Sequence, residues 1–203
     1  MIVNDSITQG TDEWLQEKLG KPSASNASKI ITNAGKSSKQ RTDYLYTLVA
    51  EKITGQREES YKNSIMQMGN DREDESRKLF EMIHGVEVQQ VGVVYKNEEK
   101  KFLCSPDGII NSEYGLELKN VLGKTQIKYL LKNEVPSEYF SQIQFSLYVT
   151  GFDHWMFMSY SPGLRPLIIK MERDEKFIKA LEFELKLFVE ELESITNQIS
   201  QGG

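Results

Sequence analysis

The first 85 residues carry apolar side chains at helical spacing. Apolar residues three and four positions apart mark one face of an amphipathic helix, and a glycine commonly follows a helix end. Gly20, Gly55 and Gly85 each stand just beyond such a segment. The pattern predicts four helices, over residues 9–19, 23–31, 42–53 and 65–84.

From residue 86 the pattern changes to short runs rich in β-branched or alternating residues, which are typical of strands. It predicts strands over residues 86–96, 102–105, 115–121, 154–160 and 167–172, and helices over 125–132, 138–150 and 174–198. This order indicates an α/β fold with a central mixed β-sheet flanked by helices. We expect a single domain over residues 1–203, with a helical N-terminal part (1–85), a sheet-containing core (86–172) and a C-terminal helix (174–198).

The composition excludes several classes of protein. The chain has no apolar run near the roughly 20 residues that span a membrane and no secretion signal at its start, so a cytoplasmic location is expected. Cys104 is the single cysteine, which excludes an internal disulfide and a multi-cysteine metal cluster. The net charge of -5 argues against a protein that merely coats nucleic acid. It still permits an enzyme with local clusters of either sign.

Two short motifs carry the candidate chemistry. Asp107 lies in Cys-Ser-Pro-Asp-Gly after the second predicted strand, and Glu117 and Lys119 lie in Gly-Leu-Glu-Leu-Lys of the third. Side chains alternate along a strand, so Glu117 and Lys119 share one face while Leu116 and Leu118 point into the core. If the two strands pair as a hairpin, Asp107 lies beside Glu117. Two carboxylates next to one lysine form a hard-oxygen site suited to Mg²⁺.

Such a site fits the hydrolysis of a phosphodiester. Carboxylate-bound Mg²⁺ activates a water and neutralises charge on the phosphate, and Lys119 would orient or deprotonate that water and stabilise the transition state. The spacing alone fits a surface hairpin with one Glu117–Lys119 salt bridge equally well. The helix before the sheet adds an acid at the rim of its apolar face, but periodicity leaves both Glu73 and Glu75 open for this role.

Motifs along nearly the whole chain resemble the lambda exonuclease family of phage recombination nucleases, within the PD-(D/E)XK superfamily. The motifs around Asp107 and Glu117, in this order, are the most specific. Weaker matches are spread over the remaining sequence, at Gln9-Gly10, Trp14, Leu19-Gly20, Ala24-Ser25, Ala50-Glu51, Thr54-Gly55, Glu73, Arg77, Leu79-Phe80-Glu81, Gln142, Gln144 and Glu172-Arg173-Asp174-Glu175-Lys176. The resemblance implies a restriction-endonuclease-like core.

The resemblance also implies a metal centre. Asp107 and Glu117 would hold Mg²⁺, or Mn²⁺ in its place, with the backbone carbonyl of Leu118 as a third contact. The family's helix-borne acid falls on Glu73 rather than Glu75.

Further roles follow from the same resemblance. Lys119 matches the family's catalytic lysine, and Gln142 matches its active-site glutamine on a helix that covers the sheet. Ser25 matches a residue of the pocket that holds the 5′-phosphate of the digested strand. Lys18 stands where the family has an arginine, so the charge is kept but the bidentate grip on phosphate is lost.

Lysines after the active-site strand offer a further DNA contact. Lys124, Lys128 and Lys132 recur every fourth residue and would form one basic stripe on a helix. A solvated helix face explains the same spacing equally well. Lys36, Lys39 and Arg41 form a second candidate basic patch, for which a polar loop is the simpler interpretation.

The predicted function is therefore a metal-dependent exonuclease that digests linear double-stranded DNA 5′→3′ and leaves 3′ single strands for recombination. An endonuclease on the same fold and a catalytically inactive DNA-end-binding scaffold are the alternatives. The resemblance further implies a ring-shaped homotrimer, a single-strand annealing protein as partner, and the host cytoplasm as location if a phage encodes the chain.

Overall fold

The strands in the described part of the chain form two sheets. The computed structural model describes residues 1–57 and 72–201. One sheet is antiparallel in the order β1-β2-β3 and contains β1 (Ile2–Asn4), β2 (Val93–Tyr95) and β3 (Leu103–Cys104). The other is mixed, in the order β4-β5-β6-β7, and contains β4 (Gly108–Ile110), β5 (Tyr114–Asn120), β6 (His154–Tyr160) and β7 (Leu167–Glu172). Its central pair, β5 and β6, is parallel.

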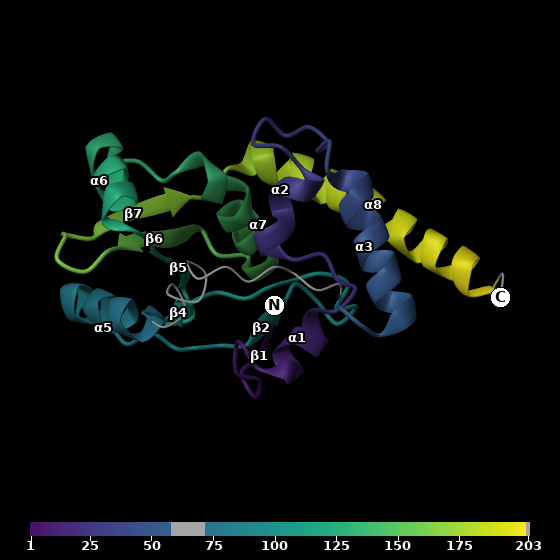
Figure 1. The fold of residues 1–203 in the computed structure, drawn as a ribbon, viewed down its shortest axis with the longest axis horizontal. Coiled ribbons are helices and arrows are strands. Elements are labelled where there is room, and N and C mark those ends of the chain that lie inside the picture. The colour runs from purple at the N-terminus through teal and green to yellow at the C-terminus, as the bar shows by residue number, and fades with distance from the viewer. Residues whose placement is uncertain (58–71, 202–203) are drawn as a thin grey trace.

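Helices cover both faces of the mixed sheet (Figure 1). The N-terminal ones are α1 (Asp12–Lys18), the 3₁₀ turn η1 (Ala24–Asn26), α2 (Ala27–Ile30), α3 (Arg41–Thr54) and α5 (Glu73–His84). The others are α6 (Gly123–Lys132), the 3₁₀ turn η2 (Ser137–Tyr139), α7 (Phe140–Thr150) and α8 (Glu175–Gln201). Helix α7 contacts both sheets as well as η1, α2 and α8. Helix α7 is buried nearly all round, and it carries no charged side chain.

The alternation of β6 divides the core into two layers. Trp155 and Phe157 belong to the larger apolar cluster, which α2, α3, α7 and α8 share. Met158 and Tyr160 belong to a smaller cluster with Phe80 of α5. Successive strand residues point to opposite faces, so α7, with α8 packed on it, covers one face of the sheet and α5 covers the other.

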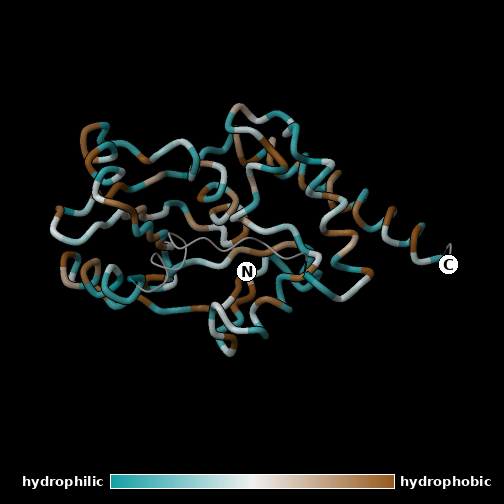
Figure 2. The backbone as a smooth tube through the Cα atoms, in the orientation of Figure 1, coloured by the Kyte–Doolittle hydropathy of each residue, from teal (hydrophilic) through white to brown (hydrophobic). Residues whose placement is uncertain are grey.

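Helix α8 shows how the sequence pattern places one element. Its buried residues recur at spacings of three and four, and Figure 2 shows hydrophobic and hydrophilic positions alternating along it. The buried stripe packs on α3 and α7. The apolar stripe of α8 therefore lies against the rest of the domain. Within the described part of the chain, no helix is both long and apolar enough to cross a membrane.

Most predicted elements are confirmed with small shifts of their ends. The strands predicted over 154–160 and 167–172 are present with those bounds as β6 and β7. The strand predicted over 86–96 is wrong in length, because β2 covers just three residues and the segment before it contributes a single bridge between Gln89 and Ile109. The stretch 65–71 of one predicted helix lies outside the described residues. The pattern gave no sign of β1 or β4, which are three residues long each.

Candidate active site

The hairpin β4–β5 brings the two predicted carboxylates together. Asp107 precedes β4, its backbone N–H donates to the carbonyl of Leu116 at 3.1 Å, and its Oδ2 accepts from the N–H of Leu118 at 2.6 Å. Asp107 therefore lies beside Glu117, as predicted. The strand pairing that was expected to bring Asp107 there is wrong. The strand before Asp107, β3, pairs with β2 in the other sheet, and the partner of β5 is β4.

Two glycines in the motifs allow this close hairpin. A Cβ on Gly108 would lie 2.0 Å from Cγ1 of Val88, and one on Gly115 would lie 2.2 Å from the Trp155 ring. Both distances are far below van der Waals contact, so the strands approach their neighbours closely only with glycine there.

Glu117 forms the buried centre of the site. It is 2% exposed, whereas its neighbours Leu116 and Leu118 point into the cluster beneath α5. The side-chain amide of Gln142 on α7 donates to Glu117 Oε1 at 2.5 Å, and Lys119 forms a salt bridge to the same oxygen. The predicted shared face of Glu117 and Lys119 is confirmed, and α7 covers that face.

The charges of the site strongly perturb one another. Burial, together with the nearby Asp107, raises the pKa of Glu117 to about 7, against the opposing effect of Lys119. Burial likewise raises the pKa of Asp107, while Lys119 opposes that shift. Burial alone would lower the pKa of Lys119, but the charges of Glu117 and Asp107 outweigh it and raise that pKa. The two carboxylates therefore favour the charged form of Lys119.

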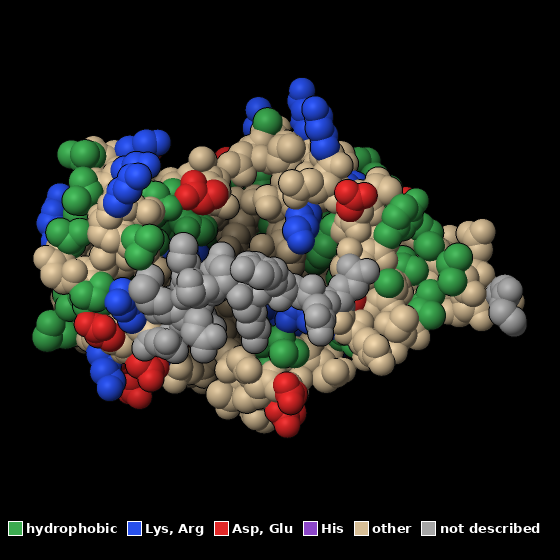
Figure 3. Space-filling view, in the orientation of Figure 1, with side chains coloured by type: hydrophobic (Ala, Val, Ile, Leu, Met, Phe, Trp, Pro, Cys, Tyr) green, Lys and Arg blue, Asp and Glu red, His purple; other side chains and the backbone are tan. Residues whose placement is uncertain are grey.

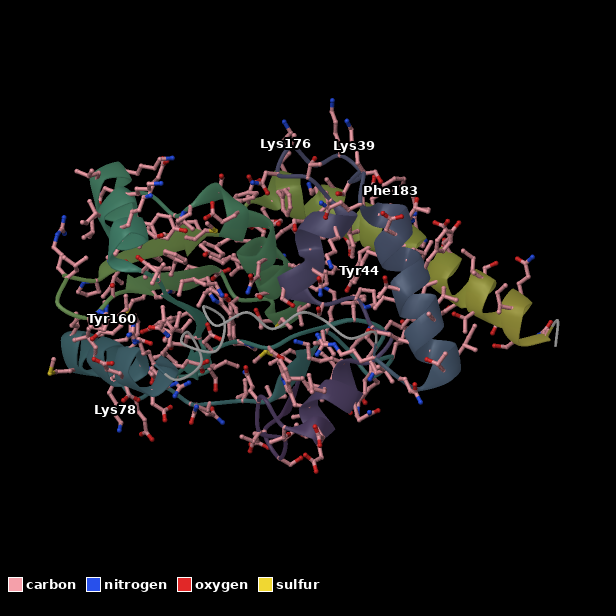
Figure 4. All side chains as sticks on the ribbon, in the orientation of Figure 1. Lys39, Tyr44, Lys78, Tyr160, Lys176 and Phe183 are labelled. Carbon is pink, nitrogen blue, oxygen red and sulfur yellow. The ribbon has the colours of Figure 1, made fainter. Side chains whose placement is uncertain are left out.

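Helix α5 supplies the third acid. Glu73 lines a cavity of about 500 Å³ together with Asp107, and burial followed by the charge of Asp107 raises its pKa. Glu75 instead accepts a hydrogen bond from the Tyr160 hydroxyl at 2.5 Å. Figure 4 shows Tyr160 beside α5, with Lys78 projecting from the outer side of the helix. The structure thus brings Glu73, not Glu75, to the cavity that Asp107 lines.

Residues of the N-terminal segment hold the turn that carries Asp107. The amide of Gln9 donates to the carbonyls of Val91 (2.8 Å) and Pro106 (2.7 Å). The Trp14 indole N–H donates to the Gly92 carbonyl and to Ser105 Oγ, both at 3.0 Å. Trp14 is thus a half-buried anchor of the active-site turn.

The cavity in front of Asp107 is acidic. We call it the acidic cavity; it is lined by Asp5, Ile7, Thr8, Gln9, Gly10, Trp14, Glu73, Asp74, Arg77, Gln90, Val91 and Asp107. Arg77 is the cation among these residues, and it forms ion pairs with Glu73 at 2.5 Å and with Asp74 at 2.6 Å.

A second cavity, of about 280 Å³, is basic. This basic pocket is lined by Leu15, Lys18, Leu19, Lys21, Ser23, Asn26, Lys29, Tyr44, Thr47, Leu48, Glu51 and Arg57. Figure 4 shows Tyr44 pointing inward from α3. Burial, then the charge of Arg57, lowers the pKa of Lys18 to about 8. The Lys18 ammonium lies 3.8 Å from the centroid of the Trp14 ring, so the walls of the two cavities meet there.

Three other predicted contact residues lie on η1 and α6. Ser25 is exposed on η1 and bonded at 3.2 Å to Ser23, which lines the basic pocket. Lys124 and Lys128 are exposed on α6. Figure 3 shows Lys and Arg side chains mixed with hydrophobic ones over the end of the molecule that α6 forms. The roles of these three residues stay predictions.

The donor set suits a hard divalent cation. Within residues 1–57 and 72–201, no three His, Cys, Asp or Glu side chains form a ready-made metal site. The candidate ligands are two carboxylates, of Asp107 and Glu117, with the Leu118 carbonyl. The contacts given above use Oδ2 of Asp107 and Oε1 of Glu117, so each carboxylate has a second oxygen that they do not engage. Oxygen donors and adjacent like charges fit Mg²⁺.

Some contacting residues were not among the predicted site residues. Arg77 stands four residues after Glu73, a spacing that favours an ion pair on a helix, so that signal was available. Gln9 gave no such signal, since its contacts depend on chain segments more than 80 residues away. Cys104 is fully buried and burial raises its pKa, which disfavours the reactive thiolate.

The fold and this site define the class of the protein, a nuclease with a PD-(D/E)XK core. Residues 13–153 match the model of the YqaJ-like viral recombinase domain, and the chain belongs to that family. The match confirms the resemblance to lambda exonuclease. The chain is also 31% identical over 70 residues to ExoD of Escherichia coli (strain K12), which covers 32% of this chain and 78% of ExoD.

Solved structures agree with this assignment. The alkaline exonuclease LHK-Exo of Laribacter hongkongensis superposes with a TM-score of 0.85 at 28% identity, over 95% of this chain and 97% of LHK-Exo. The same protein has been solved in complex with dAMP. A phage related exonuclease from Haemophilus somnus 129PT has a TM-score of 0.67 at 14% identity, over 90% and 96% of the two chains. The likeness to the Haemophilus somnus exonuclease concerns the fold alone.

Proposed function

We propose that the chain is a metal-dependent exonuclease that digests linear double-stranded DNA 5′→3′ and leaves 3′ single strands. The observation that carries the proposal is the cluster of Asp107, Glu117 and Lys119 beneath Gln142, next to a basic pocket. The dAMP complex of LHK-Exo supports it, because a deoxynucleoside monophosphate is what an exonuclease on DNA releases.

The residues of the site divide the chemistry among them. Mg²⁺, with Mn²⁺ as a substitute, would be held by Asp107, Glu117 and the Leu118 carbonyl, and would supply an activated water and charge neutralisation. Lys119 lies in reach of Glu117 and holds the attacking water in line with the phosphorus, and its charge stabilises the transition state. Gln142 fixes the Glu117 carboxylate through its short hydrogen bond.

The basic pocket would set the direction in which the strand is digested. Lys18, Lys21, Lys29 and Arg57 surround a space that suits the 5′-phosphate of one strand. A terminal phosphate held there would set the scissile bond at a fixed distance, so that digestion proceeds from the 5′ end. Ser25 would join this contact through Ser23, and Lys124 and Lys128 would hold the duplex backbone.

The test uses linear duplex DNA labelled separately at its 5′ and 3′ ends, with and without Mg²⁺. We expect metal-dependent release of mononucleotides from the 5′ end. Early loss of the 3′ label would contradict the polarity. Absence of hydrolysis with Mg²⁺ and with Mn²⁺, in a folded protein, would leave the inactive scaffold as the function.

Closed circular DNA separates the exonuclease from the endonuclease alternative. The circle has no end for the basic pocket, so we expect it to stay intact while linear DNA of the same sequence is degraded. Cleavage of the circle at a comparable rate would establish an endonuclease.

The family also suggests the assembly. We propose a ring-shaped homotrimer that encircles DNA and works with a single-strand annealing protein. Light scattering measures the mass of the purified assembly, and a mass other than that of three chains would refute the homotrimer. Calorimetry with a purified annealing protein measures binding of the proposed partner.

A further inference from the structure

Arg77 is a buried cation whose hydrogen-bonding capacity is fully used. It is 6% exposed. Nη2 pairs with Glu73 at 2.5 Å and Nη1 with Asp74 at 2.6 Å, and Nε donates to the Asp107 carbonyl at 3.4 Å. The Gln90 amide oxygen, turned towards the guanidinium, accepts from Nη2 at 2.9 Å and from Nη1 at 2.8 Å. All five N–H groups of the guanidinium therefore have an acceptor.

These bonds join three parts of the chain that carry or adjoin the site. Glu73 begins α5, Asp107 lies in the turn before β4, and Gln90 lies in the segment that leads to β2. Because the guanidinium is planar and rigid, its nitrogens fix the relative positions of their acceptors. Glu73 and the backbone of Asp107 are two of those acceptors.

Glu73 needs such a restraint. Its side chain is 32% exposed and lies on the wall of the acidic cavity. The charge of the nearby Asp107 disfavours the ionised form of Glu73, and Arg77 favours it, as the direction of each effect on the pKa of Glu73 shows. Without Arg77 the like charges would push the Glu73 carboxylate towards solvent.

We propose that Arg77 is a positioning residue, which fixes the carboxylate of Glu73 relative to the Asp107 turn by bonding to both with one guanidinium. The inference rests on the proposed nuclease function. It adds a residue that acts through two groups of the site, the Glu73 carboxylate and the turn that carries the proposed metal ligand Asp107.

A lysine at this position separates charge from geometry. Arg77→Lys keeps the positive charge near Glu73 and Asp74, but one ammonium cannot bond to Glu73, Asp107 and Gln90 together. Loss of a supporting bond to a metal-site residue typically costs about 10–100-fold in activity or metal affinity. We therefore expect Arg77→Lys to lower kcat by about 10-fold or more, with KM for DNA unchanged.

A double-mutant cycle with Glu73→Gln tests the mechanism. If Arg77 acts through Glu73, Arg77→Lys lowers kcat in the native background and has little further effect once Glu73 is already glutamine. Effects that multiply in the double variant would overturn the proposal, because they would show that the two residues act independently. A merely structural role predicts such multiplication, together with a loss of folded protein on circular dichroism.

Two further variants separate an effect on the site from a loss of folding. Gln90→Ala removes two bonds to the guanidinium from an exposed position, so it leaves folding intact. We expect a smaller fall in kcat that also disappears beside Glu73→Gln. Arg173→Lys is the matched control, since Arg173 also bonds a carboxylate (Glu175, 2.7 Å) and a backbone carbonyl (Leu147, 2.7 Å), at the start of α8. Its kcat should equal that of the native protein.

Calorimetric titration of Mg²⁺ without DNA distinguishes a failure of this inference from a failure of the proposed function. We expect Arg77→Lys to bind Mg²⁺ about 10-fold more weakly than the native chain, and Arg173→Lys to bind it equally well. If the native chain binds Mg²⁺ but hydrolyses no DNA, the proposed function fails while the weaker binding by Arg77→Lys still upholds the inference. Native Mg²⁺ affinity and native kcat in Arg77→Lys would overturn the inference alone.

Discussion

The two cavities that meet at Trp14 and Lys18 have opposite charge. The acidic cavity holds Asp5, Glu73, Asp74 and Asp107 around one arginine, whereas the basic pocket holds three lysines and Arg57 around Glu51. The contact of Lys18 with the Trp14 ring marks the boundary between them. The net charge of -5 therefore hides a local separation of charge. One side suits a divalent cation and the other a terminal phosphate, so the arrangement of the charges, rather than their sum, is compatible with the proposed DNA substrate.

The largest expected effect removes the cation at the centre of the site. Lys119→Ala takes away the charge between Glu117 and Asp107 and the group that holds the water, so kcat should fall by about 1,000-fold. Digestion of end-labelled linear DNA under saturating Mg²⁺ measures it. Lys170→Ala is the matched control, because Lys170 is also a strand lysine paired with a glutamate two residues away (2.7 Å). Near-native kcat in Lys119→Ala would leave the site without its proposed chemistry.

A smaller effect belongs to the basic pocket. Lys18→Ala removes a cation beside the proposed 5′-phosphate, and a hydrogen bond to a charged group contributes about 1.5–3 kcal/mol. We expect the preference for 5′-phosphorylated over 5′-hydroxyl ends to fall about 10-fold or more, with little change on hydroxyl ends. Lys18→Arg should raise the preference, since it restores a bidentate grip. Lys78→Ala, on the outer side of α5, is the control, and equal losses on both kinds of end would refute this role for the pocket.

The pH dependence of the same preference gives a third measure. Because the pKa of Lys18 is lowered to about 8, its charge is complete well below that pH and is lost as the pH rises through it. The terminal phosphate, with a second pKa of about 6, keeps its charge throughout the range above neutrality. The preference measured from kcat/KM should therefore decline as the pH rises through about 8 in the native chain. It should stay constant in Lys18→Arg, and a parallel decline in that variant would assign the titration to another group.

The sequence predicted the relative positions of Asp107, Glu117 and Lys119 better than it predicted the strand pairing that brings them together. Alternation along one strand sufficed to place Glu117 and Lys119 on a common face and Leu116 and Leu118 in the core. Periodicity could not distinguish Glu73 from Glu75, because both lie at the rim of the apolar helix face. In the structure Glu75 is bonded to Tyr160, a residue 85 positions away.

The missed strands share one physical cause. β1 and β4 are three residues long, and their stability comes from pairing with β2 and β5 rather than from local pattern. The hairpin partner of β5 was misassigned for this reason. Asp107 still arrived beside Glu117, since Asp107 directly precedes β4 and its backbone pairs with Leu116. Contacts such as those of Gln9 and Arg77 with the Asp107 turn arise from tertiary packing, which a single sequence does not display.

The smallest expected effect concerns the lysines of α6. Lys124 and Lys128 are exposed on the helix that follows the active-site strand, and each phosphate contact changes the slope of log K against log salt by about 0.9. The double variant Lys124→Ala, Lys128→Ala should therefore bind duplex DNA only a few-fold more weakly at moderate salt and lower the slope by about 2. Lys36→Ala, Lys39→Ala is the matched control, because these residues are exposed before α3, where Figure 4 shows Lys39 projecting outward. An unchanged slope in the α6 variant would make that stripe a solvated helix face and leave the basic pocket as the proposed phosphate contact. Equal changes of slope in both variants would instead show that DNA binding responds to the overall charge of the protein. The α6 lysines would then have no specific place along the path of the duplex.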